Sequence, residues 1–219
     1  MATGIFAGLS GSVRLALAAS AVLVGLSGAA PARAADGAVE AQIVDKLSAY
    51  LRTLSTMTGD FIQIAPNGRI SEGTFAIRRP GRMRFEYSPP DPTLMVVDGF
   101  WAAVLDEEND RSIDRFPLSE TPLNVFLKKN VDLAAEGVIA AVSFNDREYR
   151  ITAIDPEGLS QGDITMIFDR EPILLRQWIV TDALGQTTTI VLRNAKIGGK
   201  VDNELFVIPE PKRRGDDDW

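Results

Sequence analysis

The side chains that could do chemistry in this chain are carboxylates and arginines. Its 219 residues include no histidine and no cysteine. An imidazole base, a thiolate nucleophile and the usual nitrogen and sulfur ligands of zinc are therefore missing. We expect no metal site and no cofactor, so function must depend on carboxylates, arginines and apolar surface.

The densest group of carboxylates follows a predicted strand. It comprises Asp106, Glu107, Glu108, Asp110 and Asp114. Two such carboxylates could cleave a glycoside, one as acid and the other as base or nucleophile. Asn109 and Arg111 lie in the same run, however, and this mixture is typical of a solvated turn. We therefore expect no catalytic residue here and no enzyme.

An arginine among apolar residues is the more informative feature. Side chains alternate between the two faces of a strand. Phe75, Ile77 and Arg79 therefore share one face, and Arg78 lies on the other. An arginine at the end of an apolar face either extends its head group into solvent or makes hydrogen bonds inside a hollow.

Short apolar runs bounded by turn residues predict about ten strands. Asn67-Gly68 and Asp98-Gly99 are the strongest hairpin signals. The expected strands cover residues 61–64, 71–77, 83–87, 94–97, 100–105, 142–144, 148–154, 163–168, 174–181, 187–194 and 205–208. Short connections indicate an antiparallel meander. The expected fold is mainly β (α+β), an incomplete antiparallel β-barrel, or half-barrel.

Two segments have helical patterns. Apolar residues at three- and four-residue steps predict a helix over Ala38–Met57 that covers one face of the sheet. After Ser119 and Pro122, which favour a helix start, the residues Leu123, Phe126 and Leu127 form an apolar stripe. We interpret this insertion as a lid across the mouth of the half-barrel, although plain helix-on-sheet packing gives the same stripe. Residues 132–141 are a candidate for another short helix.

The chain begins with the pattern of a signal peptide. Arg14 precedes an apolar run from Leu15 to Leu26, and Ala32-Arg33-Ala34 supplies small residues for cleavage near Ala34. We therefore expect a signal peptide (1–34), a single exported domain (35–211) and a mobile charged tail (212–219). Cleavage removes two of the 23 basic residues and none of the 30 acidic ones, so the net charge changes from −7 to about −9. We expect no binding to nucleic acid or to an anionic membrane.

The ordered set of motifs resembles the LolA family, the periplasmic carriers of outer-membrane lipoproteins. It comprises G-x-F-x-[apolar]-x-R-P-G from Gly73, a V-x-D-G-x-W hairpin ending at Trp101, the segment from Thr121 to Leu127, and Leu205–Pro211. The resemblance extends over roughly Val39 to Pro211. It implies a half-barrel whose open side is covered by helices, with a hydrophobic cavity for acyl chains between them.

The resemblance also implies a cargo and partners. The cargo would be triacylated lipoproteins, received from an inner-membrane ABC transporter and passed to an outer-membrane acceptor by a monomeric periplasmic carrier. The family's Arg-Pro pair falls on Arg79-Pro80, so Arg79 would be the latch that bonds to the lid. Arg78 could compete for that role, although strand parity favours Arg79.

The residues expected to line the cavity are flexible, apolar or aromatic, since such side chains adapt to varied ligands. They are Phe61, Phe75, Ile77, Met83, Phe85, Tyr87, Met95, Trp101 and Met166. Any of them could instead be ordinary core. A lipid-sensing regulator or an envelope-assembly binding protein on the same scaffold is the alternative function.

Overall fold

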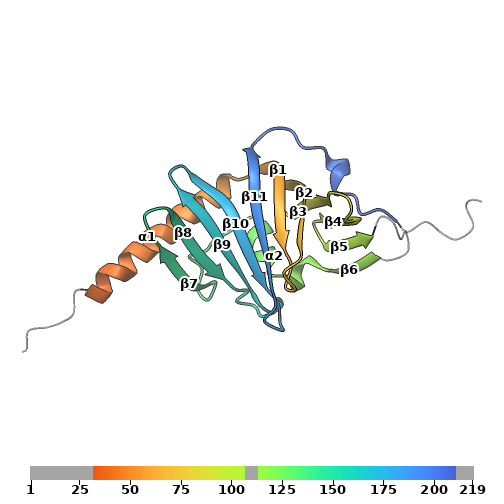
Figure 1. Cartoon of the computed structure of the whole chain (residues 1–219). Helices are drawn as coiled ribbons and strands as arrows, with labels where there is room; N and C mark the ends of the chain where they lie inside the picture. The colour runs from red at the N-terminus through yellow and green to blue at the C-terminus, as the bar shows by residue number, and fades with distance from the viewer. Residues whose placement is uncertain (1–31, 107–112, 211–219) are drawn as a thin grey trace, which may run out of the picture.

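A single antiparallel sheet dominates the computed structural model, which describes residues 32–106 and 113–210 (Figure 1). The strand order is β6-β5-β4-β3-β2-β1-β11-β10-β9-β8-β7. The strands are β1 (Thr56–Ile64), β2 (Ile70–Arg78), β3 (Arg82–Tyr87), β4 (Thr93–Asp98), β5 (Trp101–Asp106), β6 (Ile113–Pro117), β7 (Ile139–Phe144), β8 (Glu148–Ala153), β9 (Asp163–Arg170), β10 (Ile173–Thr181) and β11 (Thr187–Ile197).

The sheet is curved and open, which confirms the expected half-barrel. Its two edges, β6 and β7, do not pair with each other. The register shifts between Thr58 and Asp60, where β1 pairs with β11, and between Leu175 and Gln177, where β10 pairs with β9. Irregularities of this kind increase the local twist and bend of a strand. The concave face therefore encloses a space that helices can enter.

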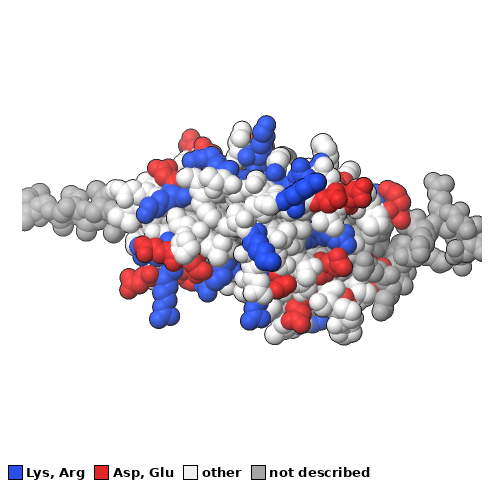
Figure 2. Space-filling view, turned by 90° about the horizontal axis from the view of Figure 1, so that it is seen from above, with Lys and Arg blue, Asp and Glu red and all other residues white. Residues whose placement is uncertain are grey.

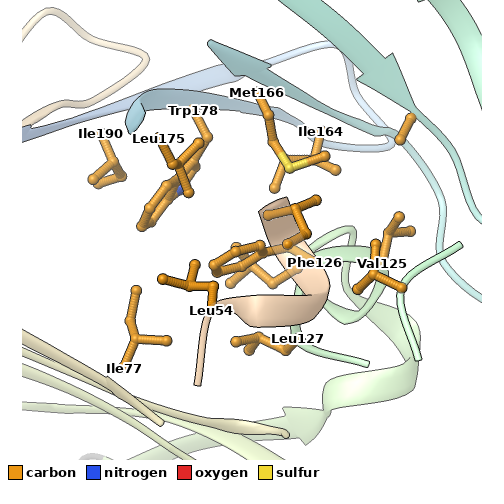
Figure 3. Packing of buried hydrophobic residues seen from close by; sticks show 14 of the residues in the cluster. Leu54, Ile77, Val125, Phe126, Leu127, Ile164, Met166, Leu175, Trp178 and Ile190 are labelled. Carbon is orange, nitrogen blue, oxygen red and sulfur yellow. The ribbon is translucent and has the colours of Figure 1, made fainter. Parts of the chain in front are cut away.

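Helices fill that space from one side. α1 (Ala32–Thr53) brings its C-terminal end onto the concave face, and the single turn of α2 (Leu123–Leu127) lies beside it. Figure 3 shows Phe126 and Leu127 of α2 among residues of the sheet and Leu54, which follows α1. These side chains belong to the main hydrophobic cluster of the described residues, together with Ile77, Met166 and Trp178. The helices thus form part of the core.

The convex face of β2–β5 is covered by the C-terminal segment 199–208, which we call the strap. Val201 and Phe206 of the strap pack with Ala76, and Ile208 packs on a second small cluster. That second cluster comprises Leu94, Val96, Ala103 and Leu105. The strap includes a short 3₁₀ helix, Asn203–Phe206.

Three arginines of β2 and β3 hold the strap in place. Arg78 donates to the carbonyl of Val201 at 3.1 Å, and both Arg78 and Arg82 donate to Oδ1 of Asn203. Arg84 donates to the carbonyl of Leu205 at 3.4 Å and to Glu86. On the face seen in Figure 2, Lys and Arg lie dispersed among uncharged residues, with Asp and Glu toward the sides. The three arginines of β2 and β3 thus fix the strap on the convex face through direct hydrogen bonds.

Several expected element boundaries are wrong. α1 ends at Thr53, and Met57, expected as its last residue, pairs in β1 with Ile77 and Ile197. Met57 satisfies the three-residue spacing after Leu54, but the β-branched Thr56 and Thr58 beside it favour a strand. Residues 132–141 are not a helix: residues 133–138 form turns, with a φ of 77° at Gly137, and residues 139–141 belong to β7.

Two further strand predictions need correction. Residues 205–208 are not a strand, because Asp202 accepts a hydrogen bond from the Glu204 amide and starts the 3₁₀ helix. β6 was not expected, since Asp114 and Arg115 interrupt its apolar residues. It pairs with β5 as an edge strand, where charged residues are tolerated.

Some expectations concern residues that are not described. The signal peptide falls mostly within residues 1–31, the charged tail within 211–219, and most of the acidic cluster within 107–112. α1 begins at Ala32, before the expected cleavage point. None of the helices in the described ranges is long and apolar enough to cross a membrane.

We predict that Phe206→Ala destabilises the protein by about 3 kcal/mol, the usual cost of removing a buried aromatic ring. Phe206 is 2% exposed. Urea unfolding measures the change in the free energy of unfolding. The adjacent Leu205 is 41% exposed, so Leu205→Ala is the matched control and should change stability by less than about 1 kcal/mol. Equal effects of the two variants would show that the strap is not anchored through Phe206.

Candidate functional site

An apolar pocket opens between the concave face of the sheet and α2. Its volume is about 560 Å³. Its walls come from β1, β3, β4, β6, β10 and β11, from the turn between β10 and β11, from the start of α2 and the segment before it, and from the loop after β8. The lining residues are Gln63, Met83, Phe85, Tyr87, Met95, Phe116, Glu120, Thr121, Pro122, Leu123, Leu159, Gln161, Trp178, Val180, Asp182, Ala183, Thr188 and Ile190. The pocket is thus a mostly apolar hollow with a few polar groups.

Four of the nine residues expected to line a cavity do so. They are Met83, Phe85, Tyr87 and Met95. Strand alternation explains this result. Met83, Phe85 and Tyr87 occupy every second position of β3 and so share its concave face, and Met95 is the cross-strand partner of Phe85. Of the expected lid residues, Leu123 also lines the pocket, whereas Phe126 and Leu127 are buried in the main cluster.

Four other expected lining residues are core residues in this closed arrangement. Phe61, Phe75, Ile77 and Met166 are each no more than 3% exposed and belong to the main cluster. Phe61 and Phe75 contact the ring of Phe85, with centroids 4.6 and 5.7 Å away. They support the pocket wall without reaching its surface.

Trp101 does not line the pocket, so its expected role is corrected. The next residue, Ala102, is buried in the main cluster on the concave face. Trp101 therefore points to the convex side, as Ala103 and Leu105 do, and it is 46% exposed. The prediction used the tryptophan's place in a motif and did not apply strand alternation to β5.

The sequence analysis did not identify the residues of β10 and β11 that form much of the pocket wall. Trp178, Val180, Thr188 and Ile190 come from β10 and β11, and Phe116 comes from the unexpected edge strand β6. β10 is apolar on both faces and contains a register shift at Leu175, so alternation alone does not identify its inward side chains. Thr188 and Ile190 share one face of β11, a signal that the sequence did contain.

Arg79 joins the end of β2 to both helices. Its Nη1 donates to the carbonyl of Leu51 and, at 3.5 Å, to that of Leu54. Its Nη2 donates to the carbonyl of Lys128 at 2.6 Å. Carbonyls at helix C-termini have no partner within their own helix, so one guanidinium satisfies the ends of α1 and α2 together. Arg78 instead bonds to the strap on the opposite face, as strand parity predicts.

The surroundings of Arg79 are mostly apolar. The guanidinium carbon lies 5.7 Å from the centre of the Phe126 ring, a cation–π distance. Burial lowers the pKa of Arg79 to about 10, so the side chain stays protonated at neutral pH. In the described part of the chain its Nε is buried with no hydrogen-bond partner. A buried cation with an unsatisfied donor makes this contact weaker than its number of bonds suggests.

Tyr87 places a polar group in the pocket wall. Its hydroxyl donates to Oε1 of Gln63 at 2.6 Å. Burial, and to a smaller extent the charge of Asp91, raise the pKa of Tyr87 to about 12. The hydroxyl therefore remains a neutral donor, and the wall carries no charge at this point.

Comparison with known proteins identifies a family. The model of "Outer membrane lipoprotein carrier protein LolA" matches residues 52–209. An outer-membrane lipoprotein carrier protein of Dechloromonas aromatica is 31% identical over 164 residues, covering 67% of this chain and 74% of that protein. One of Bordetella avium is 28% identical over 213 residues, covering 86% and 91%.

Comparison with solved structures gives a match at low sequence identity. The matched structure is that of a LolA superfamily protein from Nitrosomonas europaea, at 10% sequence identity and a TM-score of 0.43. The match covers 77% of this chain and 97% of that one.

We predict a pH-dependent role for Tyr87 in stability. Its pKa in the folded protein is above the ordinary value of 10.0, so its contribution is complete below pH 10 and is lost as the pH rises toward about 12. Tyr87→Phe has no such contribution to lose. The stability advantage of the parent over this variant, measured by urea unfolding, should shrink by about 2 kcal/mol over that range. A constant difference between the two proteins would contradict the assignment.

Proposed function

We propose a carrier function from one premise: this chain belongs to the outer membrane lipoprotein carrier protein LolA family. In this proposal the pocket binds the acyl chains of outer-membrane lipoproteins. The protein receives them in the periplasm from an inner-membrane ABC transporter and delivers them to an outer-membrane acceptor. The observation that carries the proposal is the apolar pocket of about 560 Å³ between sheet and lid.

The physical task of such a carrier is to keep acyl chains out of water and still release them. Each buried methylene gains about 0.8 kcal/mol, so two or three chains left in water would cost tens of kcal/mol. Met83 and Met95 in the pocket wall are flexible and suit varied chain shapes. An adaptable wall of this kind favours binding without a tight fit.

The size of the pocket indicates that loading requires movement. Its volume falls within the range of pockets that hold one drug-sized molecule. Three long acyl chains contain more atoms than such a molecule. The lid must therefore move away from the sheet for a triacylated cargo to enter, and Phe126 and Leu127 would leave the core as it moves.

Arg79 is suited to act as the latch of that lid. Its bonds to the carbonyls of Leu51 and Lys128 connect the sheet with both helices while the pocket is empty. The buried Nε without a partner limits the stability of this closed state. Acyl chains that enter beneath α2 would displace these bonds, so closed and open states would differ by only a few kcal/mol.

The carrier function is tested by identifying what the protein holds. The mature protein, purified from cells without detergent, should contain triacylated lipoproteins by mass spectrometry. Thr188 lines the pocket, whereas Thr189 lies on the other face of β11. Thr188→Trp should reduce the bound lipoprotein about tenfold by filling the pocket, and Thr189→Trp is the matched control. Free lipid or a regulatory membrane protein in place of lipoprotein would favour a sensor on the same scaffold.

Arg79→Leu should uncouple loading from release. Removing the guanidinium takes the Arg79 donor from the carbonyl of Lys128 and leaves that of Leu51 with only the Leu54 amide. The closed, empty state that forms on release is then less stable, so the variant should accept lipoprotein but transfer it to acceptor membranes about tenfold more slowly. Transfer of a radiolabelled lipoprotein measures both steps. Arg78→Leu is the control, because Arg78 bonds only to the strap among the described residues. Parent-like transfer by Arg79→Leu would reject the latch.

A further inference from the structure

We propose that Lys128 and Asp155 form a second clasp on the lid. It ties α2 to the far wing of the sheet, by which we mean β7–β10, whereas β2–β6 form the near wing. The inference rests on the proposed carrier function, in which the lid opens. It assigns lid-positioning roles to two side chains that take no part in the hydrogen bonds of Arg79.

The end of α2 is a junction of three contacts. The Gly81 amide donates to the carbonyl of Leu127 at 3.0 Å, and Arg79 donates to the carbonyl of Lys128 at 2.6 Å. Both of these donors belong to the β2–β3 hairpin. The third contact leaves in another direction: Nζ of Lys128 lies 3.8 Å from Oδ1 of Asp155.

Asp155 belongs to the far wing of the open sheet. It follows β8, the neighbour of the edge strand β7, whereas β2 and β3 lie on the other side of β1 and β11. Lys128 therefore joins one wing through its carbonyl and the other wing through its side chain. A tie of this kind resists separation of the two wings, the movement that a larger cargo requires.

Asp155 also holds the rim of the pocket. Its side chain is 1% exposed, and its two oxygens accept hydrogen bonds from the amides of Glu157 and Ser160 at 3.4 and 3.1 Å. The loop that these bonds shape contributes Leu159 and Gln161 to the pocket. Release of Lys128 would thus loosen the lid and this part of the rim together.

Packing around the clasp is incomplete, so there is open space beside the ion pair. A cavity of about 210 Å³ lies between the end of α2 and this loop, with Val125, Lys128, Ile154 and Pro156 among its lining residues. Lys128 is 39% exposed, and a partly solvated ion pair is weak and reversible. The buried carboxylate nevertheless loses its cation when the clasp opens, which favours closing again.

The first experiment measures the lid position in the empty protein. Because the chain has no cysteine, Asn124→Cys on α2 and Glu157→Cys on the loop introduce two unique sites for spin labels. In the parent, pulsed electron paramagnetic resonance should measure one short distance between the two spin labels. Lys128→Met should add a second distribution of label-to-label distances that is longer and broader. Lys128→Arg should give the same distance as the parent. Lys129→Met removes the same charge from the exposed neighbouring residue and should leave the distance unchanged.

The second experiment measures release of a fluorescent tripalmitoyl-cysteinyl peptide. We expect release from Lys128→Met and Asp155→Asn to be about threefold to tenfold slower than from the parent, because loss of the clasp destabilises the closed, empty state that forms on release. Release from Lys128→Arg should be close to that of the parent. Thermal unfolding of each variant separates this effect from a general loss of stability. Lys128 is partly exposed, so Lys128→Met should fold even if Asp155→Asn does not.

The outcomes separate the clasp from the carrier function. If Lys128→Met keeps the parent's distance and release rate, as Lys129→Met should, the clasp is rejected and the carrier function stands. If the parent does not bind the peptide, the carrier function is rejected, and the distance measurement still decides whether Lys128 holds the lid.

Discussion

Two helices end inside this protein, and a single guanidinium satisfies carbonyls at both ends. Without Arg79, the carbonyl of Lys128 would lose its side-chain donor, and that of Leu51 would keep only the Leu54 amide at 3.3 Å. An unsatisfied buried carbonyl costs about 1–3 kcal/mol. One side chain at the end of β2 therefore joins α1 and α2 on the concave face, in addition to the burial of their apolar side chains in the main cluster. The pocket exists in its present form because those helices are held there.

The two faces of the same strands have opposite physical tasks. On the concave side of β2 and β3, Met83 and Phe85 offer an adaptable apolar wall. On the convex side, Arg78 and Arg82 bind the strap, and apolar residues of the strap cover the sheet. Neighbouring arginines thus differ in role because strand alternation turns them to opposite faces: Arg79 bonds to the two helices, whereas Arg78 bonds to the strap.

The sequence predicts those parts of the site that depend on local rules. Alternation places Arg79, Met83 and Phe85 on the concave face, and hairpin signals at Asn67-Gly68 and Asp98-Gly99 place the turns. It fails for Met57, whose spacing after Leu54 continues the helical pattern although its neighbours and its pairing make it a strand residue. It also fails on β10, where both faces are apolar, and on β6, an edge strand with charged residues. The Lys128–Asp155 contact joins residues 27 positions apart across the lid, and no local pattern indicates it.

The latch and the clasp differ in how they tolerate mutation. Arg79 bonds to main-chain carbonyls, which every amino acid provides, so substitutions at positions 51, 54 and 128 keep its acceptors. Arg79 can therefore keep these hydrogen bonds when the side chains at those positions change, whereas the burial of Leu51 and Leu54 in the main cluster sets a separate constraint on them. The contact with Asp155 requires a particular side chain at position 128. The hold on the near wing is thus robust to sequence drift in the lid, whereas the hold on the far wing can be gained, tuned or lost by changing a single residue.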